Sequence, residues 1–206
     1  MSAWRSPETA QTTPLSVAHL LMADQGGVYP LTFNDPTLAL IPFIRTPFTQ
    51  DAGLPSEVTS PAYILGDGIS LLDDSGEPIP EGASTEGRRI RLDPGALWEI
   101  NYHVSGQDII NAYVDVGLMD AAVFEAQIAA GVPSPQRLGL LNYGSDATLE
   151  PEDRTDNLRG KYGLAWINLL EETQPMTVCL GAYNVNNSAP KNVAWWHTYM
   201  DIRRIF

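Results

Sequence analysis

The side chains of this chain best suited to metal binding or nucleophilic catalysis are three histidines and one cysteine: His19, His103, His197 and Cys179. The histidines are far apart in the sequence, and none has the spacing of a metal-ligand pair. Cys179 lies in a strand-like run with no activating side chain beside it, which predicts a small buried hydrophobic residue. The Gly-x-Ser-x-Gly motif of many hydrolases is absent. These patterns predict a protein that is not an enzyme and that needs no metal or cofactor.

Acidic side chains gather in two polar segments, residues 73–87 and 144–160. Calcium needs several oxygen ligands close together, and residues 73–77 have the oxygens without the spacing of a calcium-binding loop. Paired carboxylates that cleave glycosides usually lie in an aromatic cleft, and these lie in Pro/Gly-rich segments, although the sequence leaves that alternative open. We interpret both segments as loops whose charge is solvated.

Adjacent tryptophans at 195 and 196 point to opposite sides of a strand, so that one can enter the core and the other needs a cover. We favour a subunit interface that covers the second tryptophan. The alternatives are an exposed carbohydrate-binding platform and burial of both tryptophans within the chain. A basic chain end suits an acidic neighbouring subunit or a solvated terminus, and an apolar run near residue 21 suits docking. The predicted interface residues are Leu20, Leu21, Met22, Trp195, Trp196, Tyr199, Arg203 and Arg204.

Two long strands, within residues 92–119, position His103 and dominate the secondary-structure pattern. Trp98, Ile100, Tyr102 and Val104 fall on one face of the first strand, opposite to His103. Residues 110–118 repeat this alternation, and residues 105–108 are short and polar. The pattern predicts a β-hairpin with one buried face.

Turn-rich segments separate further apolar runs over most of the chain. Residues 121–130 predict the one short helix, capped by Asp120, and residues 1–27 predict an N-terminal arm, either frayed or docked on a neighbour. Residues 15–22 suit two helical turns or an extended docked peptide. The remainder, residues 28–206, predicts one all-β domain, an antiparallel jelly-roll sandwich of about eight to ten strands. The strands are predicted near residues 28–33, 38–45, 62–65, 69–72, 137–143, 161–170, 175–183 and 193–205, besides the hairpin.

Charge and hydropathy limit the partners of this 206-residue chain. Its net charge is −13, and its isoelectric point is near 4.4. An acidic surface repels nucleic-acid phosphates and anionic lipids, so we expect neither nucleic acid nor membrane as a partner. The sequence contains no apparent signal peptide or membrane span, which predicts synthesis as a soluble cytoplasmic chain.

From residue 88 onward, the order of features resembles the trimeric jelly roll of the tumour-necrosis-factor and complement-type globular heads. The resemblance rests on residues 93–102, where a glycine-led turn enters alternating aromatic and aliphatic positions, and on residues 197–206, where a strand ends the chain. It covers roughly the last 115 residues as a pattern, and the helix near Asp120 departs from it. The resemblance implies a homotrimer. Viruses of bacteria and archaea use similar jelly rolls as capsid decoration proteins, spike heads and shell subunits.

These observations together predict a structural virion protein, a decoration or minor capsid subunit located in the virion. Its expected partners are copies of itself, as a homotrimer, and the major capsid protein or other virion proteins. The alternative is a receptor- or carbohydrate-binding head of a fibre or spike. An enzyme built on a jelly roll is a third reading, which three scattered histidines do not favour.

Overall fold

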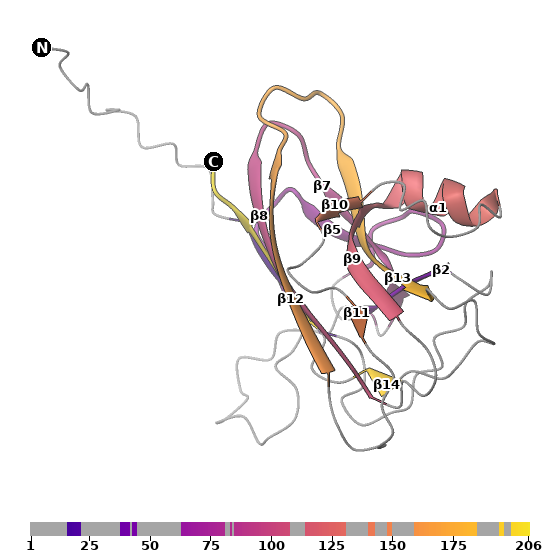
Figure 1. Cartoon of the computed structure of the whole chain (residues 1–206). Coiled ribbons are helices and arrows are strands. Elements are labelled where there is room, and N and C mark those ends of the chain that lie inside the picture. Colours follow the sequence, from indigo (N-terminus) through magenta and orange to yellow (C-terminus); the bar gives the residue numbers. More distant parts are fainter. Residues whose placement is uncertain are drawn as a thin grey trace, which may run out of the picture.

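Two antiparallel β-sheets pack face to face in the computed structural model of this protein (Figure 1). The sheet of eight strands is called sheet A, and the sheet of seven strands is called sheet B. The structure describes residues 16–21, 38–41, 43–44, 63–80, 83, 85–107, 114–130, 140–142, 148–149, 159–184, 194–195 and 199–206.

Each sheet combines long and short strands. Sheet A consists of β1 (Val17–Leu21), β3 (Phe43–Ile44), β4 (Tyr63–Leu65), β6 (Glu86–Gly87), β8 (Leu97–Gln107), β12 (Arg159–Asn168), β14 (Ala194–Trp195) and β15 (Tyr199–Arg204). Sheet B consists of β2 (Leu38–Leu40), β5 (Ile69–Leu72), β7 (Arg89–Leu92), β9 (Val114–Asp120), β10 (Leu140–Asn142), β11 (Thr148–Leu149) and β13 (Met176–Asn184).

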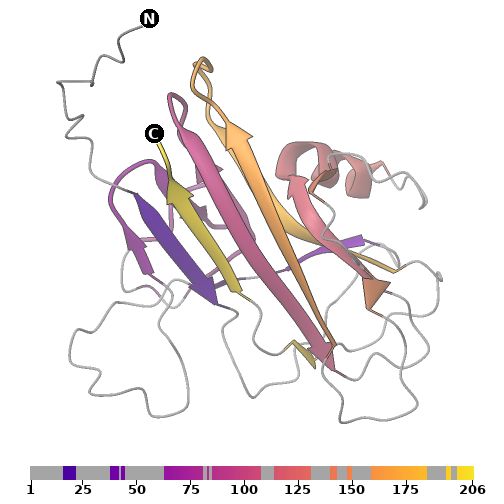
Figure 2. The same cartoon turned by 60° about the vertical axis from the view of Figure 1, so that its left-hand side comes forward.

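The strand order confirms the predicted jelly roll. The strands are ordered β12-β8-β15-β1-β3-β6 in sheet A and β10-β9-β13-β7-β5 in sheet B. Along the chain, β7, β8 and β9 alternate between the sheets, and so do β12, β13 and β15. This repeated crossing distinguishes a jelly roll from a sandwich of local hairpins. In Figure 2, β1 (indigo), β15 (yellow), β8 (magenta) and β12 (orange) lie side by side.

The predicted hairpin between the two long strands is wrong. Strand β8 pairs with β12, β14 and β15 in sheet A, whereas β9 pairs with β10, β11 and β13 in sheet B. Strand β8 also continues to Gln107, through most of the predicted turn. Alternation of side chains identifies the buried face of a strand and leaves the partner strand undefined.

The predicted buried face of β8 is confirmed. Trp98, Ile100, Tyr102 and Val104 are all buried in the core between the sheets. Tyr102 lies directly beneath its cross-strand partner Gly163 on β12, where an added Cβ would come within 2.1 Å of the Tyr102 Cζ. Glycine at 163 therefore makes room for a buried aromatic ring.

Part of the N-terminal arm predicted over residues 1–27 belongs to the sandwich itself. Val17–Leu21 forms β1, which pairs with β15 on one side and with β3 and β4 on the other. These five residues are therefore an inner strand of sheet A, neither helical nor docked on a neighbour. The strand predicted over residues 38–45 is divided into β2 in sheet B and β3 in sheet A. The strand predicted over residues 28–33 lies outside the described residues.

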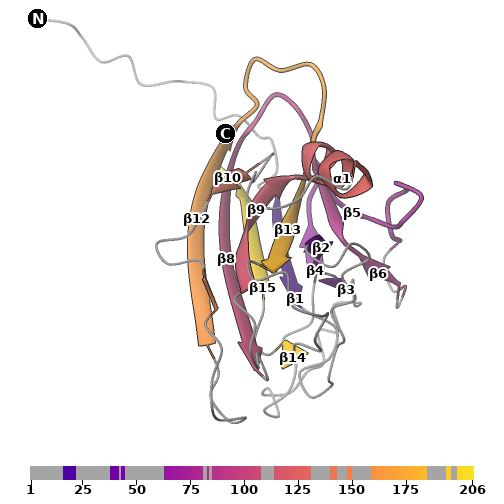
Figure 3. The same ribbon diagram turned by 45° about the vertical axis from the view of Figure 1, so that its right-hand side comes forward.

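One helix, α1 (Ala121–Ala129), covers the side of sheet B that faces away from sheet A (Figure 3). Phe124 packs with Met119 and Cys179 in a small second core between helix and sheet. The Asp120 side chain accepts a hydrogen bond from the Val123 backbone N–H at 3.1 Å, which confirms the predicted N-cap. Within the described residues, no helix is long and apolar enough to cross a membrane.

Replacing the helix cap is expected to destabilise this end of sheet B. Asp120→Ala removes the acceptor for the Val123 N–H and should lower the free energy of unfolding by about 1 kcal/mol in urea titrations. Asp120→Asn keeps a capping oxygen and should lose less than half as much. Equal stability of the alanine variant and the parent would show that the cap contributes nothing.

Candidate functional site

Three neighbouring strands, β12, β8 and β15, present one continuous surface on the side of sheet A that faces away from the core. We call this surface the outer face. It is made of Tyr162, Leu164 and Trp166 on β12, Glu99, Asn101 and His103 on β8, and Tyr199, Asp201 and Arg203 on β15. Strand register places these side chains in three rows across the strands.

The β12 side of the outer face is apolar and exposed. Tyr162, Leu164 and Trp166 are 66, 50 and 68% exposed, while Ala165 and Ile167 between them point into the core. A strand with one face in water normally carries polar residues there. Strand β12 is also at the end of sheet A, where exposed apolar strands invite pairing with other chains. This combination is typical of a contact surface.

An aromatic row occupies one end of the outer face. The His103 ring stacks on the Tyr162 ring with centroids 4.2 Å apart, and its centroid lies 5.5 Å from that of Tyr199. His103 was predicted on the polar side of its strand, and it is on that side, yet it is only 8% exposed because the two tyrosines cover it. Loss of solvent raises the pKa of Tyr199, and the Asp201 charge and Tyr162 raise this pKa further.

Charged and polar groups occupy the rest of the outer face. Glu99 accepts hydrogen bonds at 3.4 Å from the Trp166 indole N–H and from the Asn101 side chain. Arg203 lies in register with Glu99 on β15 and is exposed. The outer face therefore changes from apolar on β12 to charged on β15. Such a face suits contact with another protein surface of mixed character.

The C-terminal residues predicted for an interface separate into two groups. Tyr199 and Arg203 lie on the outer face, as their alternation on β15 requires. Arg204 points the other way, with its guanidinium 6.0 Å from the Trp98 ring and its Nε donating to the Phe206 carbonyl. Its place in an interface stays a prediction, and within its own chain this side chain contacts the end of sheet A.

Among the N-terminal residues predicted for docking, Leu20 needs correction. Leu20 is fully buried in the core of its own sandwich, because β1 is an inner strand. Leu21 ends β1, but its side chain lies outside the described residues, as does all of Met22. Trp195 belongs to β14, which pairs with the end of β8; its side chain and the whole of Trp196 are likewise outside the described part.

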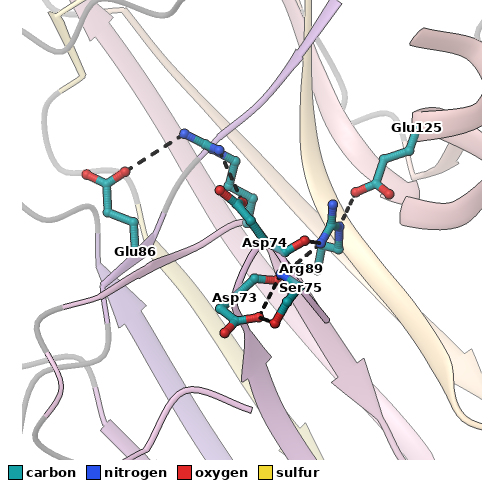
Figure 4. Close-up of polar contacts among 7 residues, drawn as sticks. Asp73, Asp74, Ser75, Glu86, Arg89 and Glu125 are labelled. Carbon is teal, nitrogen blue, oxygen red and sulfur yellow. Dashed lines mark hydrogen bonds and ion pairs between the residues drawn. The ribbon is translucent and has the colours of Figure 1, made fainter. Parts of the chain in front are cut away.

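The acidic segment near residue 73 forms a structural network rather than a site (Figure 4). Asp73 accepts hydrogen bonds from the Ser75 hydroxyl and from the Ser75 and Glu77 backbones, and the Ser75 hydroxyl is the main cause of its lowered pKa. Arg89 joins this turn to the helix through a contact with Glu125 and a 3.2 Å hydrogen bond to the Asp73 carbonyl. The described residues contain no group of three or more potential metal ligands. Glu81 and the second acidic segment, apart from residues 148–149 and 159–160, lie outside them.

Cys179 is buried between sheet B and α1, as predicted. Burial raises the pKa of this thiol well above its usual value, and the Glu125 and Asp120 charges add to the effect. The thiolate is the reactive form, so we expect the native protein to resist thiol reagents. The thiol should react in full once denaturant unfolds the chain. Rapid complete labelling of the native protein would contradict this burial.

Sequence comparisons give no family, since no protein-family model and no curated protein matches this chain. Solved structures similar in fold include crystal structures of murine APRIL at pH 5.0, 8.0 and 8.5. They are 11, 12 and 10% identical, with TM-scores of 0.46, 0.43 and 0.44 respectively. Each comparison covers 93% of this chain and 100% of the other. Because all three TM-scores are below 0.5, the fold is assigned from the strand order of this chain and not from these structures.

Proposed function

We propose that this protein is a self-assembling structural subunit whose outer face is covered by sibling copies. The observation that carries the proposal is the apolar side of that face on β12. Its three side chains are half to two-thirds exposed, so burying the remainder of each contributes roughly 1 kcal/mol per side chain and copy. An edge strand with such a surface is protected from unspecific aggregation when a specific neighbour covers it.

The unequal sides of the outer face favour a ring of subunits. When the β12 side of one copy meets a different surface of the next, the contact is head-to-tail, and it forms a ring if the rotation between copies closes. A homotrimer is the ring that the resemblance to tumour-necrosis-factor and complement-type heads implies. The aromatic row of His103, Tyr162 and Tyr199 is then part of the contact.

The setting we propose for this subunit is the shell of a virus, as a decoration or minor capsid protein in the virion. The jelly-roll fold suits such a lattice, because its sheets offer wide, rigid surfaces to neighbouring proteins. The net charge of −13 favours a protein lattice over nucleic acid or an anionic membrane as the partner. The major capsid protein is therefore the expected second partner.

Co-purification tests the virion setting. If the protein is a decoration subunit, it should sediment with assembled particles in a fixed copy number and detach without loss of the shell. A protein that never sediments with particles from its own source would rule out this setting. That result would not decide whether the free subunit assembles with copies of itself.

A carbohydrate-binding or receptor-binding head remains the second candidate, because Trp166 and Tyr162 stand exposed beside polar groups. The indole N–H of Trp166 already bonds to Glu99, which is the arrangement of an aromatic platform with a polar neighbour. Titration with simple and polymeric sugars should then change the fluorescence of the parent and not of Trp166→Ala. An unchanged parent spectrum with every sugar would reject this candidate.

A further inference from the structure

One row of the outer face places an aromatic ring, a carboxylate and a guanidinium on three neighbouring strands. Trp166 on β12 lies in register with Glu99 on β8, and Glu99 lies in register with Arg203 on β15. We call these residues the charged row. Its two ends are separated by two strand spacings, about 10 Å. Groups of opposite charge therefore have fixed positions on the face that sibling copies cover in the proposed assembly.

Trp166 and Glu99 together form a suitable site for a planar cation. The Trp166 indole N–H and the Asn101 amide each donate to a different Glu99 carboxylate oxygen at 3.4 Å. A carboxylate has about four lone-pair sites, so both oxygens can accept further hydrogen bonds. The indole beside them belongs to a residue that is 68% exposed. A guanidinium stacks on aromatic rings and binds carboxylates through two parallel hydrogen bonds, so an arginine side chain matches both features.

Arg203 is an arginine that lacks such a partner in its own chain. Its side chain is exposed and, within the described residues, makes no hydrogen bond, ion pair or ring contact, although Glu99 is its cross-strand neighbour. The other arginine side chains that the structure describes all contact groups of their own chain, namely those of Arg88, Arg89, Arg91 and Arg204. The guanidinium of Arg203 is thus available to a neighbouring molecule.

Rotational symmetry can bring the two ends of the charged row together. When copies are related by rotation about an axis along the strands, each residue keeps its height on that axis. Residues of one row then meet the same row of the next copy. The β15 side of one copy carries Arg203 to the β12 side of the next, where Trp166 and Glu99 lie.

We propose that Arg203 of one copy binds to Trp166 and Glu99 of the next copy, and that this contact sets the alignment between neighbouring copies. The inference rests on the proposed assembly and names the residues that specify it. The guanidinium stacks on the indole ring and donates to the carboxylate. Burial of all three groups by the surrounding apolar contact strengthens the pair.

Charge reversal in two separate chains tests the contact. Arg203→Glu and Glu99→Arg each place like charges opposite one another in every contact. Each change should raise the dissociation constant of the assembly at least about tenfold in sedimentation velocity, with the circular dichroism spectrum of the parent retained. Arg88→Glu is the matched control, because it makes the same change of charge beside Asp74, away from the outer face. This control should assemble like the parent.

An equimolar mixture of the two reversed chains separates a contact between copies from a contact within one chain. In a mixed trimer, two of the three contacts again join opposite charges. The mixture should therefore assemble at least about tenfold more tightly than either chain alone. A pair within one chain would gain nothing from mixing, because neither chain contains both changes.

A mixture that assembles no more tightly than its separate components would overturn this inference. Single variants that assemble like the parent would overturn it as well. In both cases the parent would still have the mass of an assembly, so the proposed function would stand. A parent chain with the mass of a single subunit would instead overturn the proposed assembly, and this inference with it.

Discussion

Leu164→Asp is expected to convert the assembled protein into single subunits at micromolar concentration. Leu164 is at the middle of the apolar side of the outer face, with Tyr162 and Trp166 on either side along β12. A carboxylate there would be buried without a partner in every copy of the interface, at a cost of several kcal/mol. Each 1.4 kcal/mol is a tenfold change, so the dissociation constant should rise at least about a hundredfold. Sedimentation velocity over a concentration series measures this change.

Val123→Asp provides the matched control for that experiment. It places the same charge at an exposed apolar residue on α1, on the opposite side of the sandwich. The control should sediment like the parent, and both variants should keep the parent's circular dichroism spectrum because both positions face solvent. Unchanged association of Leu164→Asp, or equal dissociation of both variants, would contradict a specific role of the outer face.

The second large effect concerns the fold, where Gly163→Ala should lower the free energy of unfolding by about 1–3 kcal/mol. Replacing a strand glycine with alanine ordinarily gains about 0.5–1 kcal/mol through chain entropy. Here the new Cβ would come within 2.1 Å of the Tyr102 Cζ and 2.3 Å of its hydroxyl oxygen. Tyr102 is only 2% exposed, so its ring must shift within the packed core, and we expect overpacking to outweigh the entropy gain.

Gly76→Ala separates this clash from the general effect of adding a methyl group. Nothing lies within 4 Å of a Cβ at Gly76, and its φ of 88° makes alanine costly only through local backbone strain, about 1–2 kcal/mol. Crystal structures of the two variants should therefore show a displaced Tyr102 ring in the first and an unchanged core in the second. A Gly163→Ala protein as stable as the parent would refute the close packing of β8 and β12.

The sequence was most informative where one physical signal decides the outcome. Alternation along β8 was sufficient to predict that Trp98 and Tyr102 are buried, and Asp120 before an apolar run was sufficient to predict the helix and its cap. Partner strands were not predictable in the same way, because pairing in a jelly roll joins segments far apart in the chain. For this reason the turn-like residues near the end of β8 predict a hairpin, whereas β8 and the next strand, β9, belong to different sheets.

The outer face was only partly predictable. Between Tyr162 and Ile167 the sequence has apolar residues on both faces of a strand, and this signal predicts an exposed apolar surface on one side. The burial of His103 cannot be predicted from the sequence, because it depends on tyrosines of β12 and β15 that only the folded sheet brings together. Likewise, Arg203 and Arg204 are adjacent in sequence, and the register of β15 alone decides which one faces outward.

Light scattering on the purified parent chain is the most direct test of the central claim that copies of this protein cover one another's outer faces. At tens of micromolar, the account predicts one species with a mass near three times the 22.5 kDa subunit. A homogeneous species of 22.5 kDa under the same conditions would contradict it.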